Sequence, residues 1–124
     1  MLGRKDLLGI RDLSKEEIMM ILNRAEGMKA IVEGKAPKRN DLNGETMMTL
    51  FYENSTRTRM AFTAAGKYMG ASVLDLGVAT SSVKKGETLV DTGITLDRMG
   101  TEFMVLRHSM SGAPHLLAKN VKAS

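Results

Sequence analysis

The sequence predicts an α/β domain of three layers, in which a parallel β-sheet is flanked by helices on both faces. The first observation is that short apolar runs alternate along the chain with segments of helical periodicity, which is typical of right-handed β-α-β units. The second is that 124 residues, 43% of them apolar, suit one domain with a single core, residues 1–124. The third is that polar clusters follow the apolar runs, at the strand ends where such sheets bind ligands.

A capping box opens the first predicted helix. Ser14 suits the N-cap, and Glu17 stands three positions later, where it can reach back to the cap. The helix should stop near Gly34, and the polar residues 35–44 indicate a connector. Between these ends, apolar residues recur at the spacing of an amphipathic helix, at Ile18, Ile21, Leu22, Ala25 and Met28.

The middle of the chain predicts two strands around a helix. Residues 46–52 are apolar with few charges, as in a buried strand. Residues 72–76 form the second short strand, and Gly70 before them supplies the stop of the intervening helix. One face of that helix carries Ala61, Ala64, Ala65 and Tyr68.

The last third of the chain predicts a long loop followed by a helix, a strand and a second helix. Residues 77–86 are rich in Ser, Thr and Lys and are long for a loop of a compact α/β unit. Residues 88–99 can be helical, with Leu89 and Leu96 facing inward. Residues 103–106 then form a third strand, and residues 113–119 form a final short helix.

Charge and composition argue against several classes of protein. The net charge is +4, but the basic residues are scattered among 14 acidic ones and only 4% of residues are aromatic, so nucleic acid is not the expected partner. No apolar run is long enough to span a membrane, and the charged start is unlike a signal peptide. Because cysteine is absent, we expect neither disulfides nor thiolate metal sites, which agrees with a cytoplasmic protein.

The stretch FYENSTRTRMAF, residues 51–62, predicts a site for an anion. A strand that ends at Tyr52 and a helix that begins directly after it leave backbone N–H groups pointing out of the sheet edge. The alternative is an ordinary helix cap with solvated arginines, and Arg59 cannot face the same ligand as the arginine two positions before it. Three hydroxyl groups and one guanidinium fork, all donors to phosphate oxygens, come from Ser55, Thr56, Arg57 and Thr58.

Two further polar stretches follow predicted strands. The loop TSSVKKGET, residues 80–88, is either a solvated basic loop or a flap that lends a lysine charge to a bound anion. Arg107 comes directly after an apolar strand and should face the crevice, whereas a lone His108 is more often structural than catalytic. The residues alone therefore predict an α/β domain that binds a phosphate-like anion.

Three motifs in this order resemble the carbamoyltransferases. FYENSTRTRMAF is similar to their phosphate-binding signature, and SSVKKGETLVDT and VLRHSMSGAPHLLA are similar to stretches of the aspartate branch. The ornithine branch shares the Ser-Thr-Arg-Thr-Arg motif but usually lacks this loop and the Arg-His pair. The closer resemblance is therefore to the N-terminal, carbamoyl-phosphate-binding domain of the catalytic chain of the aspartate branch.

The resemblance implies an activity. The amine of L-aspartate would attack the carbamoyl carbon of carbamoyl phosphate, giving N-carbamoyl-L-aspartate and phosphate in pyrimidine biosynthesis. Neither a metal nor a cofactor is needed, because catalysis comes from positioning and from donors aimed at the developing charge. The phosphate would be held by Ser55, Thr56, Arg57 and Thr58.

The resemblance also implies roles for residues around that phosphate. Thr58 and Arg107 would polarise the carbamoyl oxygen, so that the catalytic candidates are these two and Arg57. Ser81 and Lys85 would enter the active site of a neighbouring subunit in a homotrimer, to which regulatory chains could attach. Glu87 would orient the guanidinium of Arg57 from behind, and Arg59 would be structural.

Length is the departure from the family pattern. The family has a further strand and a second domain that binds aspartate, and we expect this chain to lack both, because it stops at NVKAS. On its own it should bind carbamoyl phosphate weakly and not turn over aspartate, and its exposed sheet edge favours self-association. Three alternatives stay open: a carbamoyltransferase with another amine acceptor such as ornithine, a non-catalytic phosphate-binding or interaction domain and, more remotely, a nucleic-acid-binding domain.

Overall fold

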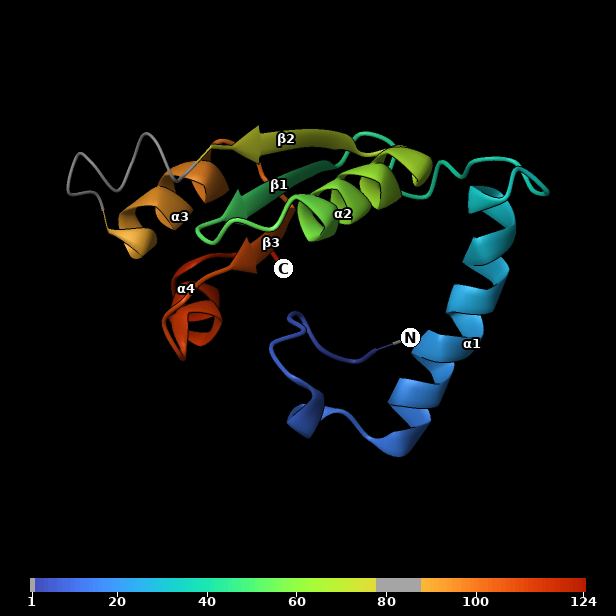
Figure 1. Ribbon diagram of the computed structural model, residues 1–124. Helices are drawn as coiled ribbons and strands as arrows, with labels where there is room; N and C mark the ends of the chain where they lie inside the picture. Colours follow the sequence, from blue (N-terminus) through green and yellow to red (C-terminus); the bar gives the residue numbers. More distant parts are fainter. Residues whose placement is uncertain (1, 78–87) are drawn as a thin grey trace.

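The computed structural model describes residues 2–77 and 88–124, and its sheet has three parallel strands in the order β2-β1-β3 (Figure 1). This confirms the predicted α/β class with a parallel sheet. The elements, in chain order, are η1 (Ile10–Asp12), α1 (Lys15–Val32), β1 (Thr46–Phe51), α2 (Thr56–Tyr68), β2 (Ser72–Leu76), α3 (Leu89–Arg98), β3 (Phe103–Arg107) and α4 (Ala113–Asn120).

β1 is the centre of the sheet and its most buried strand. Residues 47–51 are all buried, as the run of apolar residues predicts. Near its carboxyl end, Leu50 lies opposite Leu76 of β2, and Phe51 lies opposite Arg107 of β3. Because all three strands are parallel, their carboxyl ends meet at one edge of the sheet.

α3 and α4 cover one face of the sheet (Figure 1). There Leu96 and Leu117 pack with Met48 and Leu50 in the hydrophobic core, which confirms the inward position predicted for Leu96. The two helices approach closely at Gly93, where a Cβ atom would lie 2.1 Å from Cδ1 of Leu117. Only a residue without a side chain therefore fits this crossing.

α2 covers the opposite face. Gly66 is its one buried residue, and a Cβ atom there would lie 2.7 Å from the side chains of Met47 and Val73. The predicted helix is confirmed, but its contact with the sheet centres on Gly66, while Ala61 and Ala65 are exposed. The alanine pattern therefore does not mark the buried face.

α1 begins with the predicted capping box. The Glu17 N–H donates to Oγ of Ser14 at 3.1 Å, and the Ser14 N–H donates to Oε2 of Glu17 at 2.8 Å. The helix stands apart from the sheet, and it has no buried residue (Figure 1). Its amphipathic pattern therefore does not correspond to packing against any part of the chain that the structure describes, and Leu22 stays 55% exposed.

Contacts from two elements hold the C-terminal turn. Oδ1 of Asp97 in α3 accepts the N–H groups of Lys122 and Ala123 at 2.9 and 2.8 Å. From the N-terminal segment, Nζ of Lys5 donates at 3.2, 2.9 and 3.0 Å to the carbonyl groups of Ala118, Val121 and Ala123.

Ser124 lies along the free edge of β3. Its N–H donates to the carbonyl of Glu102 at 2.9 Å, and its own carbonyl accepts the N–H of Met104 at 2.8 Å. These two bonds follow the pattern of a parallel ladder, so Ser124 occupies the position of a neighbouring strand.

No helix among residues 2–77 and 88–124 is both long enough and apolar enough to cross a membrane.

Candidate functional site at the carboxyl edge of the sheet

The carboxyl ends of β1 and β3 lie side by side, and the segments that follow them form the candidate site. The N–H of Tyr52, just past β1, donates to the carbonyl of Arg107 at 2.8 Å. Residues 52–55 then lead directly into α2, so the helix N-terminus lies beside the end of β3. This is the edge at which open parallel sheets bind ligands.

The N-terminus of α2 offers donors to an anion. Ser55 is the N-cap, and the first backbone bond of the helix runs from the N–H of Arg59 to the carbonyl of Ser55 at 3.0 Å. The N–H groups before Arg59 have no partner within the helix, and the helix dipole adds positive charge there. Arg57 is exposed in this first turn, where its guanidinium can reach a ligand.

The hydroxyl of Ser55 is directed to an arginine instead of capping the helix. It makes no side-chain cap hydrogen bond, and Nη1 of Arg107 donates to its Oγ at 3.2 Å. The other side of the guanidinium is held by Glu53, because Nε of Arg107 donates to Oε2 of Glu53 at 2.9 Å. The two contacts fix the Arg107 side chain against the helix N-terminus.

Arg59 points to a different part of the sheet. Its Nη1 lies 3.4 Å from Oδ2 of Asp75 in β2, and Oδ1 of the same carboxylate accepts the hydroxyl of the buried Thr49 at 2.7 Å. The chain Thr49–Asp75–Arg59 ties β1, β2 and α2 together. This contact agrees with the structural role expected for Arg59.

A second pair of residues joins the same two strand ends. The rings of Tyr52 and His108 lie 4.7 Å apart between centroids, inclined at 40°. Nδ1 of His108 accepts the N–H of Met110 at 3.0 Å. Tyr52 also packs against the core cluster of Met48 and Leu50, so this pair lies on the α3 and α4 face of the sheet.

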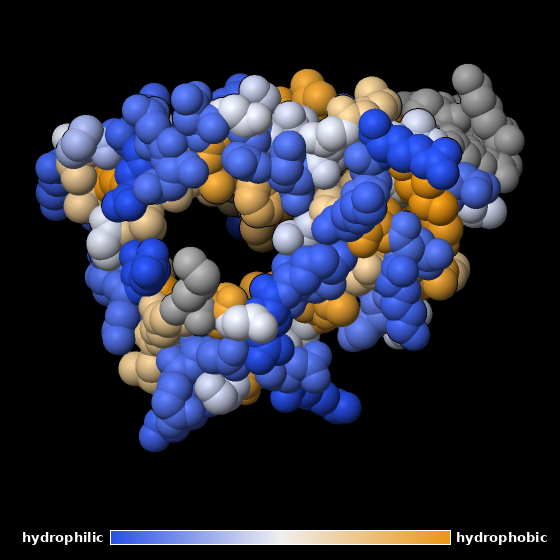
Figure 2. Space-filling model, turned by 180° about the vertical axis from the view of Figure 1, so that it is seen from behind, coloured by the Kyte–Doolittle hydropathy of each residue, from blue (hydrophilic) through white to orange (hydrophobic). Residues whose placement is uncertain are grey.

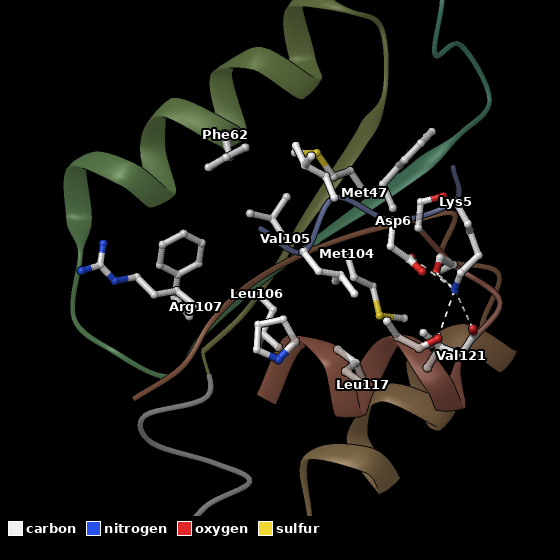
Figure 3. A pocket seen from close by; sticks show the side chains of 18 of the residues that line it. Lys5, Asp6, Met47, Phe62, Met104, Val105, Leu106, Arg107, Leu117 and Val121 are labelled. Atoms are coloured by element: carbon white, nitrogen blue, oxygen red, sulfur yellow. Dashed lines mark hydrogen bonds and ion pairs between the residues drawn. The ribbon is translucent and has the colours of Figure 1, made fainter. Parts of the chain in front are cut away.

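A cavity of about 710 Å³ extends from the site along β3. Thr58 and Arg107 line it beside many apolar residues, among them Phe62 and Val105. Figure 3 shows Arg107 and Lys5 on opposite sides of this cavity, with the apolar side chains between them. Figure 2, which views the molecule from behind relative to Figure 1, shows a hollow with hydrophobic side chains at its margin.

The structure describes one group of the predicted site residues and brings its members together. It does not describe the other group. The N-terminal turn of α2 and Arg107 are adjacent through the bond to Ser55. The residues of the loop that were predicted to act at the site, Ser81, Lys85 and Glu87, lie outside the described residues. Within the described part of the chain, no group of three or more His, Asp or Glu residues is arranged to hold a metal ion. The ligand roles of all these residues stay predictions.

Glu53 lies at the site although the sequence did not predict a role for it there. It belongs to the stretch FYENSTRTRMAF, but a carboxylate is not expected beside a predicted phosphate site. The available signal was register: Glu53 follows β1 by two positions, next to the strand that carries Arg107. An acidic residue at such a strand end is the natural partner of an arginine at the adjacent one.

Comparison with known proteins identifies similar chains. Residues 5–124 match the family model described as "Aspartate/ornithine carbamoyltransferase, carbamoyl-P binding domain". The chain is 59% identical over 123 residues to the aspartate carbamoyltransferase catalytic subunit of Ruminiclostridium cellulolyticum, and equally to that of Acetivibrio thermocellus. Each alignment covers 99% of this chain but 39% of the relative, so the chain spans about two fifths of the length of the relatives it matches.

Solved structures give the same result for the fold. The catalytic subunit of M. jannaschii aspartate transcarbamoylase superposes with a TM-score of 0.85 at 37% identity, over 97% of this chain and 39% of that one. The Trypanosoma cruzi aspartate transcarbamoylase in complex with carbamoyl phosphate and aspartate superposes with a TM-score of 0.85 at 32% identity, over 96% of this chain and 36% of that one.

Proposed function

The chain belongs to the aspartate/ornithine carbamoyltransferase family, and on that premise we propose that it is the carbamoyl-phosphate-binding half of an aspartate carbamoyltransferase. The single observation that carries the proposal is the hydrogen bond between Arg107 and Ser55, which unites the donors of the α2 N-terminus with an arginine from β3. Neither segment alone surrounds a phosphate, whereas the two together present donors from two directions.

The proposed mechanism uses these donors in two ways. The backbone N–H groups at the start of α2, with the side chains of Ser55, Thr56 and Arg57, hold the phosphate of carbamoyl phosphate. Thr58 and Arg107 donate to the carbamoyl oxygen, on which negative charge grows as the aspartate amine attacks the carbon. Removing one such donor typically lowers the rate about 10²–10³-fold.

The proposal assigns aspartate binding and the contacts between subunits to the complete enzyme. In this proposal, L-aspartate binds to the part of the complete enzyme that lies outside the 39% of the relative's length that this chain covers. Ser81 and Lys85 enter the site of a neighbouring catalytic chain in a homotrimer, and Glu87 orients Arg57. The proposed setting is cytoplasmic pyrimidine biosynthesis, with regulatory chains as further candidate partners.

Calorimetry with carbamoyl phosphate tests the proposal on the chain as it is. We expect saturable, weak binding that Arg57→Ala abolishes, because Arg57 contributes its guanidinium to the phosphate. Arg98→Ala is the matched control, since Arg98 is an exposed arginine in the last turn of α3, away from this edge. Absence of saturable binding by the wild-type chain, or equal loss in both variants, would overturn the proposal.

A further inference from the structure

Two contacts of His108 with other described residues hold the end of β3. Its ring packs against that of Tyr52 at 4.7 Å, and its Nδ1 accepts the Met110 N–H at 3.0 Å. The second contact runs from a side chain to the amide two residues later, as in turns made by Asn and Asp.

Each contact leads to another element. The N–H of Tyr52 donates to the carbonyl of Arg107, so the ring contact reinforces a backbone bond between the ends of β1 and β3. The carbonyl of Met110 accepts the N–H of Ala113 at 3.3 Å, in the first turn of α4. His108 therefore joins the ends of both strands to the start of α4.

His108 acts on the face of the sheet opposite to the Arg107 side chain. Successive residues of a strand point to opposite faces. Arg107 lines the cavity (Figure 3) and pairs with Glu53. Tyr52 packs against the core of the other face, and His108 packs against Tyr52. His108 therefore holds the end of β3 on one face of the sheet, while Glu53 and Ser55 hold the guanidinium of Arg107 on the other face.

We propose that His108 is a positioning residue for Arg107, which fixes the end of β3 so that the guanidinium stays aimed at the anion site. The identity of the ligand in this inference rests on the proposed function, whereas the contacts of His108 do not depend on it. His108 acts through its neighbour, because among the described residues it contacts Tyr52 and Met110, which hold the end of β3 that carries Arg107. The general physical reason is that a small misplacement of a donor costs a large part of its effect.

Three substitutions separate the two contacts. His108→Asn keeps an acceptor for the Met110 N–H but loses the ring, and His108→Phe keeps a ring against Tyr52 but loses the acceptor. His108→Ala loses both. His115→Ala is the matched control, because His115 is an exposed histidine of α4.

Two measurements are made on each variant of the whole chain. The first is the ¹⁵N–¹H signal of Arg107 Nε, which reports the bond to Glu53 without any ligand. The second is the calorimetric affinity for carbamoyl phosphate. We expect His108→Ala to shift or broaden the Arg107 signal and to weaken binding about tenfold, the scale of one charge-assisted hydrogen bond. His108→Asn and His108→Phe should each restore part of both, and His115→Ala should change neither.

The outcomes distinguish this inference from the proposed function. If the wild-type chain binds no carbamoyl phosphate, the proposed function fails, and the Arg107 signal alone decides the role of His108. An Arg107 signal that is unchanged in a folded His108→Ala, His108→Asn and His108→Phe would overturn the positioning role. So would normal binding by His108→Ala beside a wild-type chain that binds.

Discussion

Glu53 and Arg107 form an ion pair across the ends of two neighbouring strands, with Oε2 of the glutamate 2.9 Å from Nε of the arginine. The side chains are 38% and 46% exposed, so water screens the pair and it stabilises the fold little. The pair should instead affect ligand binding, because the Glu53 carboxylate places a negative charge beside the site where we propose that an anion binds.

Glu53→Gln should therefore strengthen carbamoyl phosphate binding about three- to tenfold, because it removes a repulsive charge near a dianion. The free energy of unfolding should change by less than about 1 kcal/mol. Calorimetry and urea unfolding measure the two quantities. Glu16→Gln, at an exposed position of α1, makes the same change in net charge and should leave the affinity unaltered. Weaker binding by Glu53→Gln would contradict the expectation.

Thr49→Val should destabilise the chain by about 1–2 kcal/mol, because the buried hydroxyl donates to Asp75 and valine of the same shape cannot. The matched control is Thr95→Val, whose hydroxyl donates to the Asp91 carbonyl on the exposed side of α3. That change should stay within about 0.5 kcal/mol. Equal urea midpoints for the two variants would show that the Asp75 contact contributes nothing.

Two glycine substitutions should have opposite effects on stability. Gly93→Ala places a Cβ atom 2.1 Å from Leu117, a buried residue, and should cost about 1–3 kcal/mol. Gly27→Ala, within α1, meets nothing within 4 Å and should stabilise by about 0.5–1 kcal/mol through helix propensity. Thermal unfolding followed by circular dichroism measures both, and a stabilising Gly93→Ala is incompatible with the α3–α4 crossing described above.

Acid should weaken the start of α1. The Ser14 N–H, and then the Arg4 guanidinium, lower the pKa of Glu17 below its usual 4.5. A carboxyl whose folded pKa is lowered contributes stability above its unfolded value and loses it as the pH falls through the folded value. Helicity at 222 nm should therefore decrease below pH 4.5, and less so in Glu17→Gln, which can still cap but does not titrate. A decrease of the same size in Glu17→Gln would assign it to other carboxyl groups.

The apolar cavity should make the chain self-associate, as exposed apolar patches do. Phe62 lines it and is 44% exposed, so Phe62→Asp should shift sedimentation toward the monomer. Met60→Asp is the control, because Met60 lies on the same helix and is 63% exposed but does not line the cavity. Equal effects of the two variants would show that general charge, and not the cavity, controls association.

Local signals in the sequence predict most of the fold. The capping box at Ser14 and the strand 72–76 are confirmed with their boundaries, and the third strand extends one residue further than predicted, to Arg107. These features depend on neighbours in the chain, which a sequence displays directly. The burial of α2 at Gly66 was not predicted, because a glycine in a helix gives no sign of a close crossing until the opposing side chains are placed.

The candidate site was predictable in part for the same reason. The donors at the α2 N-terminus follow one another in sequence, so their cluster is visible without a structure. The contacts of Glu53 and Ser55 with Arg107 span 54 and 52 positions and follow from the strand order β2-β1-β3. The ring contact between His108 and Tyr52 likewise depends on the β1–β3 register. The sequence alone therefore does not predict which residue a lone histidine contacts.

The Lys5 contacts constrain the order in which parts of the chain fold. Lys5 and Val121 are 116 positions apart, so their bond closes a loop of that length. The entropy cost of such a loop grows only slowly with length, but the loop can close only after β1, β3 and α4 have placed Lys5 and Val121 near each other. The segment around Lys5 is therefore among the last parts of this domain to reach its final place.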